Sequence, residues 1–355
     1  MSPEAPRSRN SAPRGSDNAP TSSADLRRRP RLQDIAEVTG VSIKTVSRAI
    51  RGDGPVADAT RTRILAEADR LGFQLNDIAA GLRRKDQSMS TVGVTLGDLT
   101  NPFFAPMLRG IHAVAAEHRH LVLTGDAQND TDLEHRVIRQ FFAHRVAGLI
   151  VTPIGTDLGY LADEASYGAA IVFVDSPPPG LDGLLDAVTT TNEQTTREGI
   201  AMLVARGHRR IGFLGHPRAG SGALERWNGY RAALEAAGLP LDMGIVRDGL
   251  VTDADATTAA ESVLSGPDAP TAMFTDNNRL CVGLLLSTAY STRPVDVLSF
   301  DDFPLAPKFG VSVIDSDPYE VGRVGAQLLF DRLADRARPA QRAVVPARLV
   351  VRQRA

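Results

Sequence analysis

Six side chains between residues 42 and 48 offer the chemistry that reads the edges of DNA bases. They supply hydroxyl groups, one aliphatic group and two cations: Ser42, Ile43, Lys44, Thr45, Ser47 and Arg48. In the major groove, Arg or Lys reaches guanine O6 and N7, and an aliphatic side chain contacts a thymine methyl group. A solvated polar helix face has a similar composition. The structure of the segment that carries these residues must therefore distinguish a DNA-reading helix from an ordinary surface helix.

The segment that carries them, residues 32–50, buries its apolar residues only if it folds as two short helices joined by a turn. Those residues fall on one face of each helix: Leu32, Ile35 and Ala36 in the first, and Val46, Ala49 and Ile50 in the second. Gly40 suits the turn, and Ser42 is a good N-cap for the second helix. This is the helix-turn-helix pattern, although a plain helical hairpin is the commoner fate of two amphipathic helices.

A third helix is predicted at residues 58–71, with Gly72 as a suitable C-terminal stop. Its apolar residues recur at helical spacing: Ile64, Leu65, Ala68 and Leu71. Three short helices with facing apolar stripes are enough to close a small core.

The charge of the chain is unevenly distributed, although its net value is only −2. Residues 27–85 carry 13 Lys and Arg against 7 Asp and Glu, whereas residues 1–26 carry three of each sign. Residues 86–355 therefore carry a net charge of −8. A basic block on an acidic body indicates a nucleic-acid-binding module joined to a domain of another kind, or simply a charged helical segment.

Length and composition bound the class of protein. A chain of 355 residues, 43% hydrophobic and 5% aromatic, predicts two or three soluble globular domains with a large core. No run approaches the roughly 18 apolar residues of a membrane span, and the N-terminus lacks the apolar core of a signal peptide, so we expect a cytoplasmic protein with no membrane partner. The single cysteine, Cys281, excludes an intramolecular disulfide and disfavours a thiolate metal site.

From residue 91 onward, short β-branched runs alternate with amphipathic helices. The first set predicts buried parallel strands at TVGVTLG, HLVLTG, AGLIVTP and AIVFVD, with helices near residues 103–117, 130–143 and 156–167. The second set predicts strands at RIGFLG, TAMFTD and VDVLSF, with helices near residues 193–206, 223–237, 254–264 and 278–289. Two such units resemble the periplasmic-binding-protein fold, in which two lobes close on a ligand at the carboxyl ends of their strands.

Five motifs occur in this order: DIAEVTGVSIKTVSRAI, TRTRILAEADRLGFQLNDIAAGLRR, NPFF, RGHRRIGFLG and LSFDD. Together they make the chain, from about Arg31 to the C-terminus, resemble the lactose-repressor and purine-repressor (LacI) family of bacterial transcription regulators. Two positions depart from the family pattern at helix starts. Arg31 stands where Thr is usual, and Ala57 stands where Ser is usual, with Asp58 in place to cap one residue later.

The resemblance and the composition together imply four parts. These are a disordered Ser-, Pro- and Arg-rich tail at 1–29, a helix-turn-helix headpiece at 30–73, a hinge helix or linker at 74–88 and a two-lobed domain at 89–355. The helix after residue 317 and the last strand are expected to return to different lobes. Lobe 1 would comprise about 89–188 and 317–337, and lobe 2 about 189–314 and 341–355.

NDIAAGLRRK, residues 76–85, matches the family's hinge helix, which orders on operator DNA and inserts a leucine into the minor groove. Leu82 occupies the place of that wedge. A helix this short is marginal alone, which suits a switch, although an ordinary basic linker would look similar. The expected roles are base contacts for Ile43, Lys44 and Arg48, and phosphate contacts for Ser42, Thr45, Ser47 and Asn76.

Four polar residues at or beyond strand ends match effector-contacting positions of the family: Asp175, Arg226, Asn277 and Asp301. Two carboxylates, an amide and a guanidinium can bind vicinal hydroxyls or a polar heterocycle through paired hydrogen bonds. Taken singly, each aspartate is more readily explained as the cap of a turn. Their convergence favours one pocket.

Several departures from the family limit the identity of the effector. Leu250 replaces a common stacking aromatic, which weakens the case for a plain hexose and leaves a smaller or more aliphatic polyol possible. The other departures are Thr191 for Asp, Asn278 for Asp, Ser299 for Gly and Ser316 for Gln.

Nothing in the sequence demands catalysis. GSGALE near Gly220 lacks the unit that a dinucleotide fingerprint requires, and His112, His118 and His120 do not match the spacing of a metal motif. No G-x-S-x-G elbow occurs. We therefore expect no enzyme, no catalytic residue, no metal and no cofactor.

These observations predict an all-α helix-turn-helix headpiece with a hinge helix, followed by an α/β two-lobed periplasmic-binding-protein-like domain. The expected function is a DNA-binding regulator, a repressor, that binds near-palindromic operator DNA as a homodimer or a larger even oligomer. A small polar effector, which is a sugar, a polyol or a nucleobase-like compound, would control it. The alternatives are a solute-binding receptor, which needs a signal peptide, and a two-lobed α/β enzyme.

Overall fold

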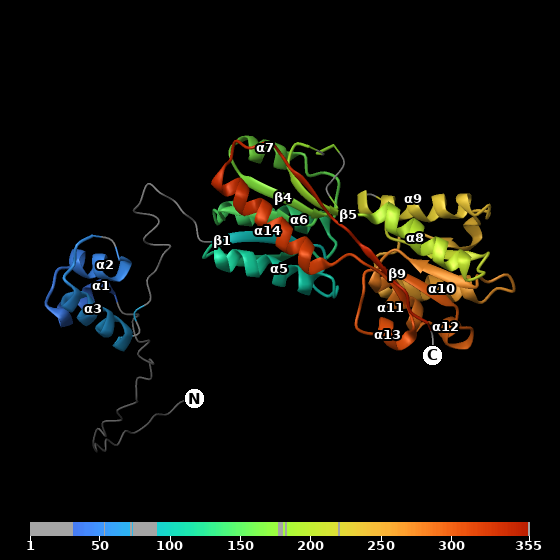
Figure 1. Cartoon of the computed structure of the whole chain (residues 1–355), viewed down its shortest axis with the longest axis horizontal. Coiled ribbons are helices and arrows are strands. Elements are labelled where there is room, and N and C mark those ends of the chain that lie inside the picture. The colour runs from blue at the N-terminus through green and yellow to red at the C-terminus, as the bar shows by residue number, and fades with distance from the viewer. Residues whose placement is uncertain are drawn as a thin grey trace, which may run out of the picture. The chain divides into compact units, whose positions relative to one another are not determined.

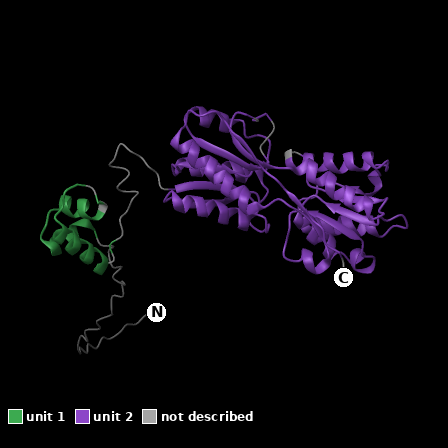
Figure 2. Ribbon diagram, viewed as in Figure 1, with its two compact units in different colours: residues 1–79 green, residues 80–355 purple. Residues whose placement is uncertain are grey.

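The computed structural model describes residues 31–52, 54–71, 73, 91–176, 180–181, 183–218 and 221–353. The chain divides into two compact units, Met1–Ala79 and Ala80–Ala355, drawn in green and purple in Figure 2. The expected tail, the expected hinge helix with Leu82, and Asn76 lie outside the described residues.

Three helices form the headpiece: α1 (Leu32–Thr39), α2 (Ile43–Arg51) and α3 (Asp58–Arg70). Ile35, Val46 and Ile64 are fully buried where the three helices meet. Each helix contributes one of these residues, so burial of apolar surface holds all three together. Leu65, expected on the same apolar face, is instead 45% exposed.

The starts of α1 and α3 differ from expectation. Arg31 brings no capping hydroxyl, but the Asp34 carboxylate accepts a hydrogen bond from the Arg31 backbone N–H at 2.6 Å. This reciprocal contact satisfies a donor at the helix start. Asp58 does not cap α3, because it is the first helical residue and Ala57, the N-cap, makes no side-chain cap bond.

The second unit contains two six-stranded sheets, which are parallel except for the antiparallel pair β10 and β12 (Figure 1). Sheet 1 runs β11-β5-β4-β3-β1-β2, with bounds Arg342–Val345, Asp186–Thr190, Ala170–Asp175, Gly148–Val151, Thr91–Leu96 and Leu121–Asp126. Sheet 2 runs β12-β10-β9-β8-β6-β7, with bounds Arg348–Val350, Ser312–Asp315, Asp296–Phe300, Ala272–Thr275, Ile211–Leu214 and Val246–Arg247.

Helices cover both faces of each sheet, which explains why the central strands are apolar on both sides. In lobe 1, one face carries α5 (Phe104–Glu117) and α14 (Pro318–Ala334), and the other carries α6 (Thr131–Ala143) and α7 (Tyr160–Ser166). Lobe 2 carries α8 (Asn192–Ala205) and α9 (Ser221–Ala236) on one face, and α10 (Asp253–Leu264), α11 (Asn278–Leu286) and α12 (Thr288–Thr292) on the other. Two short helices complete lobe 2: η1 (Met243–Ile245) and α13 (Ala306–Phe309). Within the described residues, no helix has the length and apolar character needed to cross a membrane.

The strand predicted at HLVLTG forms, but its predicted burial is wrong. The strand β2 forms an edge of sheet 1, and Leu121 and Leu123 on it are 71% and 43% exposed. The motif HLVLTG has the same apolar character as the buried central strands β1, β3 and β4, so composition alone does not identify an edge.

The C-terminal strand, expected to belong to lobe 2, is divided between the lobes. Arg342–Val345 forms β11, which pairs with β5 in sheet 1, and only Arg348–Val350 forms β12 in sheet 2. Pro346 lies between them, and it has no backbone N–H for a continuous ladder. Residues 341–345 are therefore part of lobe 1.

The helix expected at residues 278–289 is also divided. Ser287 has extended backbone angles, φ −68° and ψ 145°, and its side chain accepts a hydrogen bond from the Tyr290 backbone N–H at 3.1 Å. Serine is a favourable N-cap, so this residue ends α11 and starts α12.

Helices α5 and α14 of lobe 1 approach so closely that their crossing requires glycine. A Cβ at Gly110 would lie 2.1 Å from the Tyr319 carbonyl oxygen, and one at Gly322 would lie 2.0 Å from the Met107 carbonyl oxygen. Both obstacles are backbone atoms, which cannot move aside without separating the helices.

We expect Gly110→Ala to lower the free energy of unfolding by at least about 2 kcal/mol, because overpacking outweighs the roughly 1 kcal/mol that alanine gains over glycine in a helix. Urea unfolding followed by circular dichroism measures the change. The control is Gly159→Ala, since nothing lies within 4 Å of a Cβ there and φ is −56°. Equal stability of the two variants would contradict the close packing.

Candidate functional site

The turn between α1 and α2 sets the position of the predicted DNA-reading side chains. Gly40 takes the left-handed conformation with φ 66°, and the Ser42 hydroxyl accepts a hydrogen bond from the Thr45 backbone N–H at 3.1 Å. The expected turn glycine and the expected N-cap are both confirmed. The first turn of α2 is therefore ordered by local contacts.

The side chains of α2 divide into buried and exposed sets. Val46 and Ala49 are buried against the other two helices, whereas Ile43, Lys44 and Arg48 are exposed. These three residues thus present an aliphatic group and two cations on one helix. A Cβ built on Gly54 would lie 3.5 Å from the Arg48 Cδ atom, so the segment after α2 passes beside the Arg48 stem.

The expected phosphate ligands on α2 are less free than the cations. Thr45 and Ser47 are half-buried, and the hydroxyls of Ser42 and Thr45 lie 2.8 Å apart, within hydrogen-bond distance of each other. Exposed cations reach a nucleic acid more readily than hydroxyls that already have a partner.

A second candidate site is a cleft of about 250 Å³ between the two lobes of the body. The ends of strands β1, β3 and β4 line it from lobe 1, and the ends of β6, β8 and β9 line it from lobe 2. Ligands of open α/β sheets bind at such carboxyl ends. All four predicted effector residues line this cleft: Asp175, Arg226, Asn277 and Asp301.

Arg226 is the best-connected side chain of the cleft, and it is only 8% exposed. Its Nη1 donates to the Asp276 carbonyl oxygen at 2.8 Å, and its Nε donates to the Asn192 side-chain oxygen at 2.9 Å. Its Nη2 lies 3.7 Å from Asp175 Oδ1, and its Cζ lies 3.8 Å above the Phe300 ring. The guanidinium is thereby fixed at the floor of the cleft.

The two aspartates adopt the same unusual backbone conformation at the ends of their strands. Asp175 has φ 72° and Asp301 has φ 63°. Left-handed conformations cost about 1 kcal/mol or more in non-glycine residues, and they concentrate at functional sites. Here they turn the chain at the end of β4 and directly after β9.

Asp301 is buried, and burial raises its pKa to about 6. Arg226 opposes this rise in the pKa, Asp175 adds to it, and a hydrogen bond from the Ser316 hydroxyl opposes it. That bond joins Ser316 Oγ to Asp301 Oδ1 at 2.6 Å. A carboxyl group titrating near neutrality can either accept or donate a hydrogen bond to a ligand.

Asn277 caps α11, because its side-chain oxygen accepts from the Arg279 backbone N–H at 2.6 Å. The amide nitrogen is the group left to meet a ligand. Asn277 therefore both caps a helix and lines the cleft.

Sequence reasoning missed a further acid in the cleft, Asp276. Asp276 is 1% exposed, and its carboxylate accepts from the His216 backbone N–H at 2.9 Å and lies 3.0 Å from His216 Nδ1. Both residues line the cleft, His216 just after β6 and Asp276 just after β8. Asn277 was selected because it is a polar residue at or beyond a strand end. The same criterion, applied to every strand, would have selected His216 and Asp276 as well.

Sequence reasoning also missed the contacts that join the lobes. Arg279 of lobe 2 forms an ion pair with Asp98, and its Nη1 donates to Thr100 Oγ1 at 3.0 Å. Its Nη2 donates to Asp253 Oδ1 of lobe 2 at 2.8 Å. Burial alone would raise the pKa of Asp98, but hydrogen bonds from Thr100 and the charge of Arg279 lower it.

The aromatic side chains of the cleft come from the NPFF motif. Phe103 and Phe104 line the cleft from lobe 1 with their rings edge to face, 5.3 Å apart. The cleft thus has aromatic surface from lobe 1, and Leu250 is not among its lining residues. Among the described residues, no group of three or more His, Cys, Asp or Glu is placed to hold a metal ion.

Comparison with known proteins agrees with this geometry. Residues 89–303 match the family described as "Periplasmic binding proteins and sugar binding domain of LacI family", and residues 31–76 match "Bacterial regulatory proteins, lacI family". The HTH-type transcriptional regulator PtxS of Pseudomonas aeruginosa is 30% identical over 343 residues, which cover 92% of this chain and 96% of PtxS.

Two further relatives are similar over most of their length. The HTH-type transcriptional repressor CytR of Escherichia coli is 27% identical over 310 residues, 85% of this chain and 89% of CytR. The structure of the lac repressor dimer bound to operator superposes with a TM-score of 0.80 at 22% identity, covering 92% of this chain and 99% of that one, and it supports the fold. The predicted helix-turn-helix headpiece followed by a two-lobed α/β domain is confirmed, and the chain belongs to the LacI family of bacterial DNA-binding transcription regulators.

Proposed function

We propose that this chain is a cytoplasmic repressor that binds a near-palindromic operator as a homodimer and is controlled by a small polar effector held between its lobes. The observation that carries the proposal is the set of three exposed side chains, Ile43, Lys44 and Arg48, on a helix whose start is fixed by its own cap. The division into tail, headpiece, hinge and two lobes, at the boundaries given above with residues 341–345 moved to lobe 1, is part of the proposal.

The division of labour at the DNA follows from exposure and chemistry. Lys44 and Arg48 contact base edges, and Ile43 contacts a thymine methyl group. The polar residues Ser42, Thr45, Ser47 and Asn76 position phosphates. Leu82 enters the minor groove at the centre of the operator.

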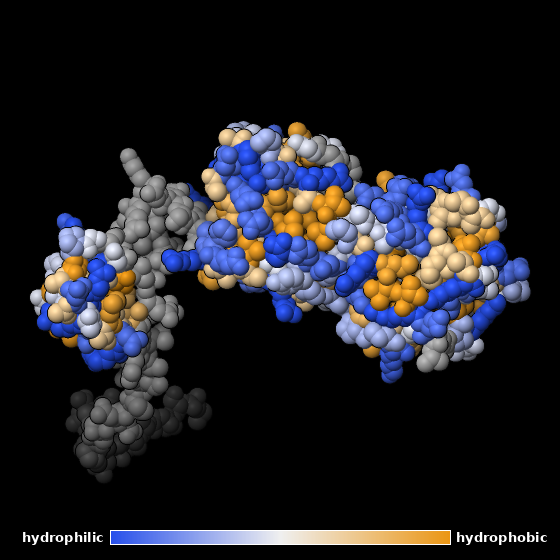
Figure 3. Space-filling view, in the orientation of Figure 1, coloured by the Kyte–Doolittle hydropathy of each residue, from blue (hydrophilic) through white to orange (hydrophobic). Residues whose placement is uncertain are grey.

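Homodimer formation is supported by apolar surface on both lobes. Leu121 on the edge strand β2 is 71% exposed, and Leu286 at the end of α11 is 70% exposed. Figure 3 shows apolar surface gathered on the visible face of each lobe. Exposed edge strands and apolar patches of this kind are normally covered by a partner, and a second copy covers both lobes at once.

The effector class follows from the arrangement of donors and acceptors. The cleft presents the fixed guanidinium of Arg226, near the carboxyl groups of Asp175 and Asp301, and it is also lined by Asn277. Alternating donors and acceptors suit adjacent hydroxyls of a sugar or polyol, or the edge of a nucleobase-like compound. Phe103 and Phe104 supply apolar surface for the carbon skeleton.

The direct test of the function is fluorescence anisotropy on labelled DNA from the gene's own upstream region, with random DNA as competitor at several salt concentrations. We expect binding that survives the competitor and falls with salt as phosphate contacts are screened. Equal affinity for random DNA, with and without metabolite pools, would show that the headpiece binds DNA only through its positive charge, without sequence specificity.

Arg48→Ala should weaken operator binding by about 1–3 kcal/mol if Arg48 makes a bidentate guanine contact. Binding to random DNA should change much less, so the same anisotropy assay measures the ratio of the two losses. Arg63→Ala in α3 is the control, because it removes an equal charge from the headpiece at another exposed position. Equal losses on both DNAs would show that Arg48 contacts the DNA phosphates rather than the base edges.

Asp301→Asn should change the pH dependence of stability. Because the folded-state pKa of about 6 lies above the unfolded value, wild-type stability falls as pH rises from about 4 through 6. The asparagine variant avoids this loss and should gain up to about 3 kcal/mol relative to wild type at pH 8, and little at pH 4. Thermal unfolding across this range measures the difference; a difference that does not vary with pH contradicts the raised pKa.

Asp98→Asn should loosen the lobes by removing the ion pair with Arg279. Spin labels placed by cysteine substitution at the exposed Glu117 and Glu235, one in each lobe, report the distance between lobes by pulsed electron resonance. We expect a longer and broader distance distribution in the variant. The control Asp315→Asn breaks an ion pair within lobe 2 and should leave the distribution unchanged; identical distributions for both variants would show that the Asp98 contact does not hold the lobes.

A further inference from the structure

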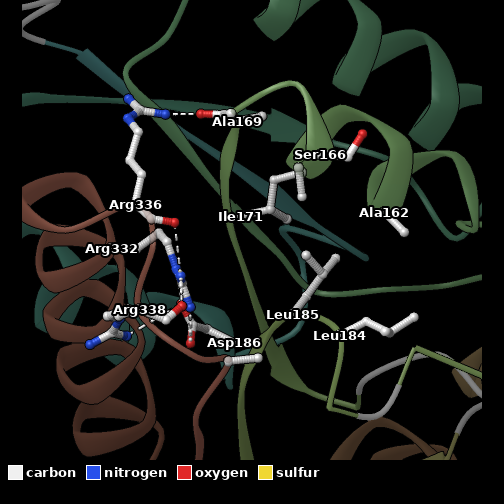
Figure 4. Close-up of a pocket in the computed structure, with 13 residues that line it drawn as sticks. Ala162, Ser166, Ala169, Ile171, Leu184, Leu185, Asp186, Arg332, Arg336 and Arg338 are labelled. Carbon is white, nitrogen blue, oxygen red and sulfur yellow. Dashed lines mark hydrogen bonds and ion pairs between the residues drawn. The ribbon is translucent and has the colours of Figure 1, made fainter.

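A cavity of about 310 Å³ lies in lobe 1, apart from the effector cleft and sharing no lining residue with it. Helix α7, the start of β4, the segment leading into β5 and the end of α14 enclose it. Figure 4 shows arginines on one side of this cavity and apolar side chains on the other.

The cationic side is built around a buried carboxylate. Asp186, whose side chain is fully buried, receives Arg332 Nε at 2.9 Å on one oxygen and Arg332 Nη2 at 3.1 Å on the other. Arg338 Nη2 lies 3.3 Å from the same carboxylate, and the Gln341 backbone N–H donates to it at 2.7 Å. Its capacity to accept hydrogen bonds is therefore filled by these groups.

The charges of this side do not balance among the lining residues. Three guanidinium groups, from Arg332, Arg336 and Arg338, face one carboxylate, that of Asp186. Arg338 Nη1 lies 3.5 Å from Asp331 Oδ2. That carboxylate is half-exposed, so water weakens this ion pair. The two largely buried cations, Arg332 and Arg338, are thus matched by two carboxylates, and the exposed Arg336 is the cation that can take up an anion.

Two polar groups at the cavity also remain available. Arg338 Nε is buried without a hydrogen-bond partner. Arg336 is exposed, and its guanidinium is anchored by one donated hydrogen bond, to the Gly168 carbonyl. The two guanidinium groups lie apart, with the Arg332–Asp186 pair between them (Figure 4), so an anion at the open edge of the cavity would meet Arg336 alone.

A purely structural role explains only part of this cluster. Arg332 donates to the Arg336 carbonyl oxygen at 3.3 Å and to the Pro339 carbonyl oxygen at 3.1 Å, so it fastens the turn between α14 and β11. Arg336 takes no part in the buried ion pair. Nor does that role account for Leu184, which is 60% exposed at the edge of the cavity.

The opposite side of the cavity is apolar. It consists mainly of the side chains of Ala162, Ala165, Ile171, Leu184 and Leu185. A ligand with charge alone would leave this surface wet, whereas a ligand with a short hydrocarbon body would bury it.

We propose that this cavity is a second ligand site that takes a small organic anion, with one carboxylate on a short apolar body. The carboxylate meets Arg336, and the body lies against Ile171 and Leu184. The site is distinct from the effector cleft and does not depend on the function proposed for that cleft.

Isothermal titration calorimetry of the full chain with benzoate, cyclohexanecarboxylate and hexanoate tests the site. At least one carboxylate should bind, benzyl alcohol should not, and inorganic phosphate should bind at least tenfold more weakly than the best carboxylate. Arg336→Gln should weaken carboxylate binding about tenfold through loss of a charge-assisted contact, and Leu184→Ser should weaken it severalfold.

The control Arg139→Gln removes an equal charge from an exposed position on α6 of the same lobe and should bind as wild type does. Urea unfolding of each variant establishes that the fold is intact. Absence of binding by all three carboxylates, equal affinity of Arg336→Gln and wild type, or phosphate binding as tight as that of the carboxylates would each overturn the proposal.

Discussion

Arg226 is a buried cation, and the arrangement of the body depends on keeping it paired. Moving a guanidinium out of water costs several kcal/mol unless hydrogen bonds and a counter-charge replace the lost hydration. The replacements come from separate elements: Asn192 at the start of α8, the carbonyl of Asp276 after β8, and Asp175 at the end of β4. Because Asp175 belongs to lobe 1 and Arg226 to lobe 2, the stability of this charge is linked to the relative position of the lobes. A ligand that supplies or removes a partner of Arg226 therefore acts on that position.

The segments that cross between the lobes lie close to the same network. Ser316, which donates to Asp301, belongs to the crossover from β10 to α14, where Asp317 adopts φ 49°. Thr191, in the crossover from β5 to α8, accepts a hydrogen bond from the Ala347 backbone N–H, in the crossover from β11 to β12. Residues of the segments that cross between the lobes therefore contact, or adjoin in sequence, residues of the cleft network. A ligand bound in the cleft would therefore act directly on the segments that join the lobes.

The sequence predicted features that arise from local chemistry. Gly40 and Ser42 set the turn and cap of the helix-turn-helix, and aspartates after apolar runs marked the strand ends that form the cleft. Features that depend on neighbours distant in sequence were not predicted. The sequence of β2 looks like that of a central strand, and only the sheet order makes Leu121 exposed. The pairing of Asp98 with Arg279 joins positions 181 residues apart, and no local pattern foretells it.

A ligand in the inter-lobe cleft should change the affinity of the headpiece for DNA. The most direct measurement is operator affinity with and without the sugar, polyol or nucleobase that most raises the thermal stability of the protein, together with ligand affinity on free and operator-bound protein. Linkage requires that the two ratios be equal. We expect a change of about fivefold or more, with the same factor from both directions. Operator affinity that does not vary with a ligand whose binding is lost in Arg226→Gln would contradict it.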